Sequence, residues 1–102
     1  MFVSKNLDIN EKGNLTIGGV DTIALAKEYG TPLYVMDENL IRENCRSFKD
    51  SIEKFYNSEG LVCYASKAFC CKELCRIMKD EGIGLDVVSG GELFTAINVD
   101  FP

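Results

Sequence analysis

From residue 32 onward, short apolar runs alternate with stretches that have the periodicity of a helix. The predicted segments follow one another as strand 32–36, helix 37–57, strand 61–65, helix 72–81, strand 84–89 and helix 91–98. Strands that are apolar on both faces and separated by helices predict a parallel sheet covered by helices. An open doubly wound sheet and a closed (β/α)8 barrel both begin this way, and the alternation alone does not separate them.

The residues before this alternation predict a smaller unit of a different kind. Two short β-type runs, 7–9 and 15–17, flank a glycine-containing turn, which is typical of a β-hairpin. Asp21 and Asp37 each precede a helical stretch and suit its N-cap. Gly30 suits the left-handed residue that ends a helix. We therefore expect a hairpin, a short helix ending at Gly30, and a long helix starting after Asp37.

The length of the chain limits how much of a parallel α/β fold it holds. A (β/α)8 barrel needs about 250 residues, whereas this chain has 102. Three parallel strands leave an exposed edge and too little apolar core for a complete domain. We therefore expect these residues to be the opening part of a longer protein.

Charge and composition exclude several classes of function. The net charge is −5 and the 11 Lys and Arg residues are scattered, so we expect no nucleic-acid binding. No apolar stretch approaches the roughly 18–20 residues of a membrane span. The 5 Cys residues, odd in number and without an export signal, indicate reduced thiols in a cytoplasmic protein. With no His and no C-x-x-C pair, we expect no metal site.

Lys67 is the most informative single residue, because it follows an apolar strand where the sheet gives way to a loop. The carboxyl edge of a parallel sheet is where ligands bind in α/β proteins. A lysine that loses hydration in a partly apolar mouth becomes available as a nucleophile. Alternation places Cys63, Ala65 and Lys67 on one face, where small side chains leave room for a flat ring. On position alone, a solvated lysine in a loop is the commoner outcome.

Four blocks of sequence form a recognisable set: YASKA at 64–68, GLDVVSGGEL at 84–93, LTIGG at 15–19 and GTPLYV at 30–35. The first resembles the cofactor-lysine motif of the fold-type III pyridoxal-phosphate enzymes, the superfamily of alanine racemase and ornithine decarboxylase. The second resembles the G-x-D-V-x-S-x-G-E-L block of its decarboxylase branch. The last two look like the diaminopimelate decarboxylases within that branch. Together the blocks cover nearly the whole chain at the family's spacing.

This resemblance implies a fold and a reaction. Residues 31–102 would supply the first three βα units of a pyridoxal-phosphate-binding (β/α)8 barrel. Residues 1–30 would be an extension that belongs with the family's C-terminal β-domain. The complete enzyme would be a cytoplasmic homodimer that binds a small amino acid, meso-2,6-diaminopimelate, and decarboxylates it to L-lysine.

The resemblance also implies which residues act. Lys67 would carry pyridoxal phosphate and then move a proton, and Asp86 and Glu92 would lie near it as further catalytic residues. Ala65 and Asp86 would line the cofactor site. Since Asp86 lies inside an apolar strand, we expect its carboxylate to be buried and paired. For Glu92, an acid favoured by the dipole of a helix first turn is an equally good interpretation, and Ser89 receives no role.

Two alternatives stay open. The isolated 102 residues are expected to be a catalytically inert folding or interaction fragment, because the family's later phosphate loops, its cofactor-stacking His and its partner-subunit Cys are missing from them. The complete enzyme could instead act on ornithine, arginine or carboxynorspermidine. The blocks at 15–19 and 30–35 argue against these substrates, but the substrate-reading residues of the family lie beyond residue 102.

Overall fold

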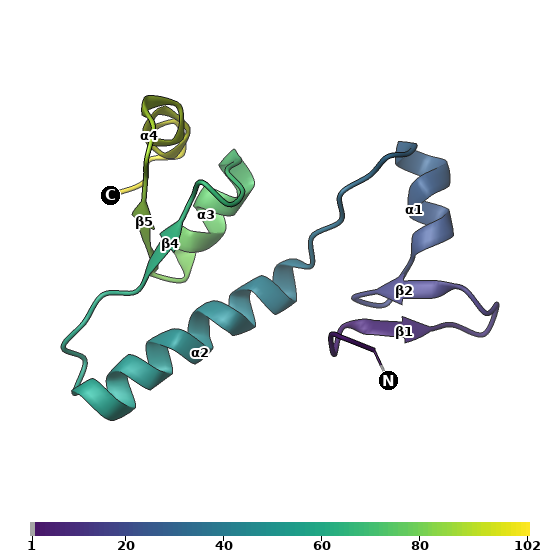
Figure 1. The fold of residues 1–102 in the computed structure, drawn as a ribbon, viewed down its shortest axis with the longest axis horizontal. Coiled ribbons are helices and arrows are strands. Elements are labelled where there is room, and N and C mark those ends of the chain that lie inside the picture. Colours follow the sequence, from purple (N-terminus) through teal and green to yellow (C-terminus); the bar gives the residue numbers. More distant parts are fainter. Residues whose placement is uncertain (1) are drawn as a thin grey trace. The chain divides into compact units, whose positions relative to one another are not determined.

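The computed structural model describes residues 2–102, which form two compact units, one ending at Ile41 and the other beginning at Arg42. Figure 1 labels the elements along the chain. They are β1 (Leu7–Ile9), β2 (Leu15–Ile17), β3 (Val20–Asp21), α1 (Thr22–Tyr29), α2 (Glu38–Tyr56), β4 (Cys63–Ala65), α3 (Lys72–Asp80), β5 (Gly84–Asp86) and α4 (Gly90–Ile97). Within residues 2–102, no helix is both long enough and apolar enough to cross a membrane.

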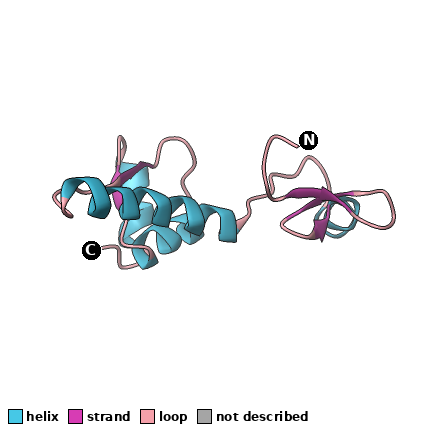
Figure 2. Cartoon of the chain, turned by 90° about the horizontal axis from the view of Figure 1, so that it is seen from below, coloured by secondary structure: helices cyan, strands magenta, loops and turns pink. Residues whose placement is uncertain are grey.

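The first unit contains the expected hairpin. Strands β1 and β2 pair antiparallel, with Leu7 opposite Ile17 and Ile9 opposite Leu15. A third strand, β3, pairs antiparallel with β2 and was not predicted, because two residues are too few to show a period. Helix α1 packs against β2 and β3, and Figure 2 shows it in cyan beside the magenta strands.

Asp21 joins the hairpin turn to helix α1, as well as serving as the expected N-cap. Its Oδ1 accepts hydrogen bonds from the backbone N–H groups of Ile23 at 2.8 Å and Ala24 at 3.2 Å. Its Oδ2 accepts from the side-chain amides of Asn10 at 2.8 Å and Asn14 at 2.9 Å. The bonds from Asn14 and Asn10 are the main causes that lower the pKa of Asp21 from 3.8 to about 2.

The lowered pKa of Asp21 predicts an acid-sensitive turn. A depressed folded pKa contributes stability that is fully present above about pH 4 and is lost as the pH falls toward about 2. Hydrogen exchange of peptides covering 7–29 should therefore become faster over this pH range, relative to intrinsic rates. In Asp21→Asn, the amide still caps α1 but cannot accept from two Asn amides. The variant should exchange faster at neutral pH and show no further loss in this window; an unchanged acid response would contradict the assignment to Asp21.

Helix α2 begins where the sequence predicts. Asp37 Oδ1 accepts from the backbone N–H of Leu40 at 3.2 Å, and Oδ2 accepts from the side-chain amide of Asn6 at 3.0 Å. These hydrogen bonds, the one from Asn6 above all, lower the pKa of Asp37. Gly18 has a left-handed φ of 57°, and a Cβ there would lie 2.7 Å from Asp37 Oδ2. Only glycine therefore fits beside this carboxylate without a shift.

The second unit contains a parallel pair of strands, which confirms the predicted strand direction for this part of the chain. Strands β4 and β5 pair with Cys63 beside Gly84, Tyr64 beside Leu85 and Ala65 beside Asp86. Helix α3 connects them and contacts both β5 and α4. The core beneath these helices is a cluster of buried and half-buried residues: Cys75, Ala96, Val99, Cys70, Leu85 and Phe101.

An ionic cluster fastens α2 to the end of α3. The largely buried carboxylate of Glu81, the residue that caps α3, accepts from Arg42 at 3.0 Å and twice from Arg46 at 2.9 Å. The ammonium of Lys49 donates to the backbone carbonyl of Glu81 at 2.6 Å. The hydrogen bond from Arg46 is the largest cause that lowers the pKa of Glu81, followed by that from Arg42. Paired this way, a buried carboxylate keeps its charge.

The strand predicted at 32–36 is wrong, and the strand predicted at 84–89 is too long. Residues 32–36 form no strand, and in the described part of the chain no strand pairs with them. An apolar run becomes a strand only where a neighbour supplies a backbone ladder. Strand β5 ends at Asp86 because its neighbour turns away: the Ser66 N–H makes the last contact, to the Asp86 carbonyl at 3.1 Å.

Candidate active site

Lys67, Ala65 and Asp86 lie at one edge of the small parallel sheet. Because β4 and β5 are parallel, their carboxyl ends meet at the same edge. Ala65 and Asp86 are the last residues of the two strands and are register partners. Lys67 follows two residues after β4, in a turn closed by the Ala68 N–H to the Ala65 carbonyl at 3.2 Å. The expected residues therefore gather at the edge where parallel α/β proteins bind ligands.

The two faces of this sheet differ in what covers them. Leu85 packs against the helical core, and its register partner Tyr64 lies on the same face. The opposite face carries Cys63, Ala65 and Asp86, which are all exposed. Lys67 is exposed too, in the turn that follows β4. The residues on the open face before this turn are small: Ala65, Cys63 and, beside Cys63, Gly84.

Asp86 differs from its expected setting. Its side chain is exposed instead of buried, because residue 86 falls on the open face of the sheet. Its backbone carbonyl accepts from the Ser66 N–H at 3.1 Å, but its carboxylate has no hydrogen-bond partner within residues 2–102. The carboxylate is therefore exposed at the same edge of the sheet as the turn that carries Lys67.

Glu92 lies in the first turn of α4, and its carboxylate is bound from two sides. Ser66 Oγ donates to Oε1 at 2.5 Å, and Ser89 Oγ donates to Oε2 at 2.8 Å. The Ser66 hydrogen bond is the largest cause that lowers the pKa of Glu92, followed by the Ser89 bond. The nearby positive charge of Lys67 lowers it further. Glu92 is therefore negatively charged, is attracted to the positive charge of Lys67, and is hydrogen-bonded to Ser66, the residue before Lys67.

Two serines in this site were not assigned a role from the sequence. Ser89 was predicted to be in a strand, which is wrong: it is the N-cap of α4, and its Oγ accepts from the Glu92 N–H at 3.2 Å. Residues 89–92 carry the capping-box sequence S-x-x-E, and the serine half of that motif is present, while the Glu92 carboxylate binds Ser89 Oγ and the Val88 N–H and not the Ser89 backbone N–H. Ser66 is only 1% exposed. Its hydrogen bond to Glu92 joins positions 26 residues apart, so no local sequence pattern predicts this bond.

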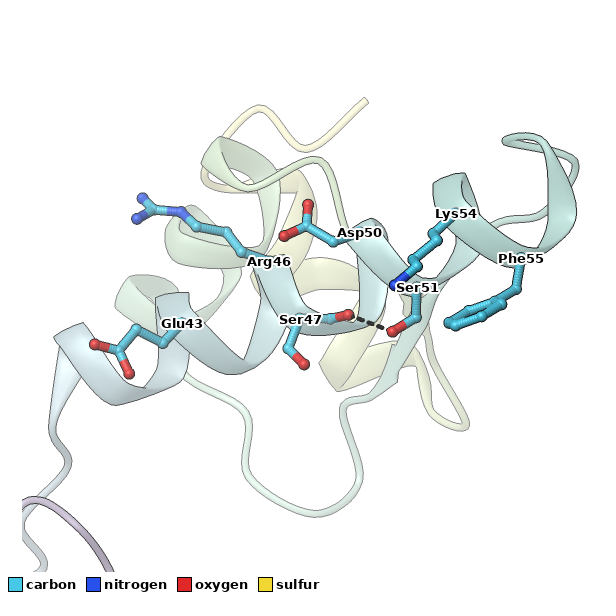
Figure 3. A pocket seen from close by; sticks show the side chains of 7 residues that line it. All are labelled: Glu43, Arg46, Ser47, Asp50, Ser51, Lys54 and Phe55. Atoms are coloured by element: carbon cyan, nitrogen blue, oxygen red, sulfur yellow. Dashed lines mark hydrogen bonds between the residues drawn. The ribbon is translucent and has the colours of Figure 1, made fainter.

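A pocket elsewhere in the second unit takes no part in this site. Figure 3 shows the side chains that line it, all from helix α2: Glu43, Arg46, Ser47, Asp50, Ser51, Lys54 and Phe55. None of them was expected to act in chemistry, and Arg46 is already bound to Glu81. The described residues also contain no group of three His, Cys, Asp or Glu side chains arranged to hold a metal ion.

Comparison with known proteins gives relatives over the whole chain. The diaminopimelate decarboxylases of Bacillus methanolicus and Bacillus subtilis are 51% and 50% identical to it, and each alignment covers 100% of this chain and 23% of the relative. The solved structure of diaminopimelate decarboxylase from M. jannaschii in complex with L-lysine superposes with a TM-score of 0.87 at 36% identity. That superposition covers 100% of this chain and 24% of the other. The chain thus spans about a quarter of the length of these relatives.

The family model described as the pyridoxal-binding domain of pyridoxal-dependent decarboxylases matches residues 38–102. This stretch includes the whole candidate site, from β4 to the first turn of α4. The match confirms the family and the pyridoxal cofactor that the sequence motifs predicted. The chain belongs to the pyridoxal-dependent decarboxylase family, and its residues 38–102 match the pyridoxal-binding domain of that family.

Proposed function

We propose that the complete protein carrying residues 1–102 decarboxylates meso-2,6-diaminopimelate to L-lysine with pyridoxal phosphate as cofactor. Two observations support this substrate. Relatives that are 51% and 50% identical to this chain in sequence are named diaminopimelate decarboxylases. The solved relative that superposes over the whole chain was crystallised with L-lysine, the product of that reaction.

We also infer the architecture of the complete protein. Residues 31–102 begin a (β/α)8 barrel, supported by the order β4-α3-β5-α4 with parallel strands. Residues 1–30 are an extension that packs with a β-domain encoded later in the protein, supported by the separate antiparallel sheet β1-β2-β3. The complete enzyme works as a homodimer in the cytoplasm.

The residues at the carboxyl edge fit a pyridoxal cofactor. A flat pyridine ring needs an amine within reach and room beside it, and this edge offers exposed Lys67 in the turn after an open face of small residues, Ala65, Cys63 and Gly84. When bound, the cofactor supplies an electron sink for the electron pair that remains when carbon dioxide departs. Lys67 would hold the cofactor aldehyde through its side-chain amine and would then hold or return a proton at the reacting carbon. The exposed Asp86 carboxylate at the same edge would accept hydrogen bonds from amine groups and orient them.

The observation that carries the proposal is the placement of Lys67, and borohydride tests it. Borohydride converts the bond between a lysine amine and a pyridoxal aldehyde into a stable adduct. We expect reduction of the complete holoenzyme, followed by peptide mapping, to place the pyridoxyl group on Lys67. Lys72 lies five positions further on and is also exposed, so it serves as an internal control that should stay unmodified. An adduct on any other lysine would remove Lys67 from its proposed role.

A further inference from the structure

Ser66 connects the end of β4 to the start of α4 from a fully buried position. Its backbone N–H donates to the Asp86 carbonyl at 3.1 Å, so its main chain is fixed to β5. Its Oγ lies 2.5 Å from Glu92 Oε1 and 3.2 Å from the Asp86 carbonyl. A hydroxyl has one hydrogen, and the shorter bond to a charged acceptor is the stronger one. The proton of Ser66 therefore points to Glu92.

The carboxylate that receives this bond is held at both oxygens. Glu92 Oε2 accepts from Ser89 Oγ at 2.8 Å, and the Glu92 N–H donates to Ser89 Oγ at 3.2 Å. The Val88 N–H lies 3.5 Å from Oε1. The first turn of α4 and its cap therefore orient the carboxylate to which Ser66 is bound.

Lys67 follows Ser66 in the chain. The hydrogen bonds that hold Ser66 therefore also fix the position of the Lys67 Cα, from which the side chain extends. The Lys67 backbone is held on its N-terminal side by Ser66 and on its C-terminal side by the turn from Ala68 to Ala65. The Ser66 hydroxyl is buried and bound to Glu92, whereas the Lys67 side chain is exposed and, among the described residues, makes no hydrogen bond to Glu92. Besides the attraction of their opposite charges, Glu92 therefore acts on Lys67 through the position of Ser66.

We propose that Ser66 is a positioning residue for Lys67, and that the Ser66–Glu92–Ser89 chain holds the lysine amine at the geometry needed to bind the cofactor aldehyde. This inference rests on the proposed role of Lys67 and deepens it. Misplacement of a reacting group by about 1 Å can lower a rate by about 10²-fold. The expected effect thus falls on the rate of cofactor attachment and on kcat, with KM little changed.

The test uses the complete protein and two variants that cut the same bond from opposite ends. Ser66→Ala removes the donor without adding volume, and Glu92→Gln keeps the shape but makes the acceptor neutral. The apoprotein is mixed with pyridoxal phosphate, and the adduct on Lys67 is trapped with borohydride over time. We expect Ser66→Ala to attach the cofactor about 10- to 100-fold more slowly, and Glu92→Gln to show a smaller loss. Ser51→Ala, which removes an exposed hydroxyl bound to the Ser47 carbonyl, should match wild type.

The double variant separates positioning from independent damage. If both residues act through one bond, Ser66→Ala with Glu92→Gln should attach cofactor no more slowly than the worse single variant, because the two effects are not additive. Wild-type attachment rates in Ser66→Ala would overturn the inference while leaving Lys67 in its proposed role. Should Ser66→Ala fail to fold, Glu92→Ala, which removes the acceptor, decides alone, and a wild-type rate there also overturns it. An adduct missing from Lys67 in wild type would instead refute the proposed function.

Discussion

Replacing Lys67 by alanine in the complete protein is expected to lower the release of carbon dioxide from meso-diaminopimelate by about 10³-fold or more, the range typical of a lost proton-transfer group. The physical reason is that Lys67 is the only lysine within six residues after the carboxyl ends of β4 and β5, in the described part of the chain. Lys67→Arg should fail as well, since a guanidinium keeps its charge but is a poor nucleophile toward an aldehyde.

The control for this prediction is Lys72→Ala, which removes an exposed lysine at the start of α3 and should leave the rate unchanged. Ornithine, arginine and carboxynorspermidine belong in the same assay. Release of carbon dioxide from one of these in preference to meso-diaminopimelate would replace the proposed substrate while keeping the role of Lys67. Full activity in Lys67→Ala would exclude that role.

Ile77→Ala should be among the most destabilising substitutions in the second unit. Ile77 is 4% exposed and lies on the buried side of α3 with Leu74, Cys75 and Met78. Truncation of a buried isoleucine removes apolar contact area and leaves a cavity, which costs about 2–5 kcal/mol. Urea unfolding of the complete protein, followed by circular dichroism, should show a lower midpoint for the transition that contains this unit.

The matched control for Ile77→Ala is Arg76→Ala, one position earlier on the same helix. Arg76 is exposed and pairs with exposed Glu73 at 3.1 Å. Surface pairs of this kind contribute about 0–1 kcal/mol, so the midpoint should move little. Equal losses from Arg76→Ala and Ile77→Ala would show that the burial of Ile77 is not what stabilises α3, because alanine has a higher helix propensity than either residue.

The helices could be predicted from the sequence because their signals are local. Asp21 and Asp37 make the expected capping bonds, and Gly30 after α1 has the expected positive φ, 84°, although its ψ of 179° lies outside the αL region that was predicted. Periodicity located all four helices to within about two residues, which is the usual spread of boundary assignments. The parallel direction of β4 and β5 also followed, because a helix between two apolar runs requires a crossover.

The strand ends could not be predicted, because a strand depends on its neighbour. Residues 32–36 have the composition of a strand but no ladder within the described chain, and 87–89 lose theirs where β4 turns away after Ser66. The features of the candidate site also divide into those that local sequence predicts and those that depend on distant residues. Family motifs pointed to Lys67, Asp86 and Glu92, and the capping-box sequence at 89–92 is readable. The bond from Ser66 to Glu92 links distant positions and needed the fold.

The pairing of β4 with β5 alone has a practical consequence. Each strand bonds to its neighbour along one side only, so the other side of each presents free backbone N–H and C=O groups in the described chain. Such open sides are templates for pairing between molecules, and exposed Leu61 and Val88 lie next to them. In concentrated solution, molecules that consist of residues 1–102 alone will therefore tend to associate through intermolecular β-sheets. A soluble preparation of this segment needs a lysine or proline placed to block those sides.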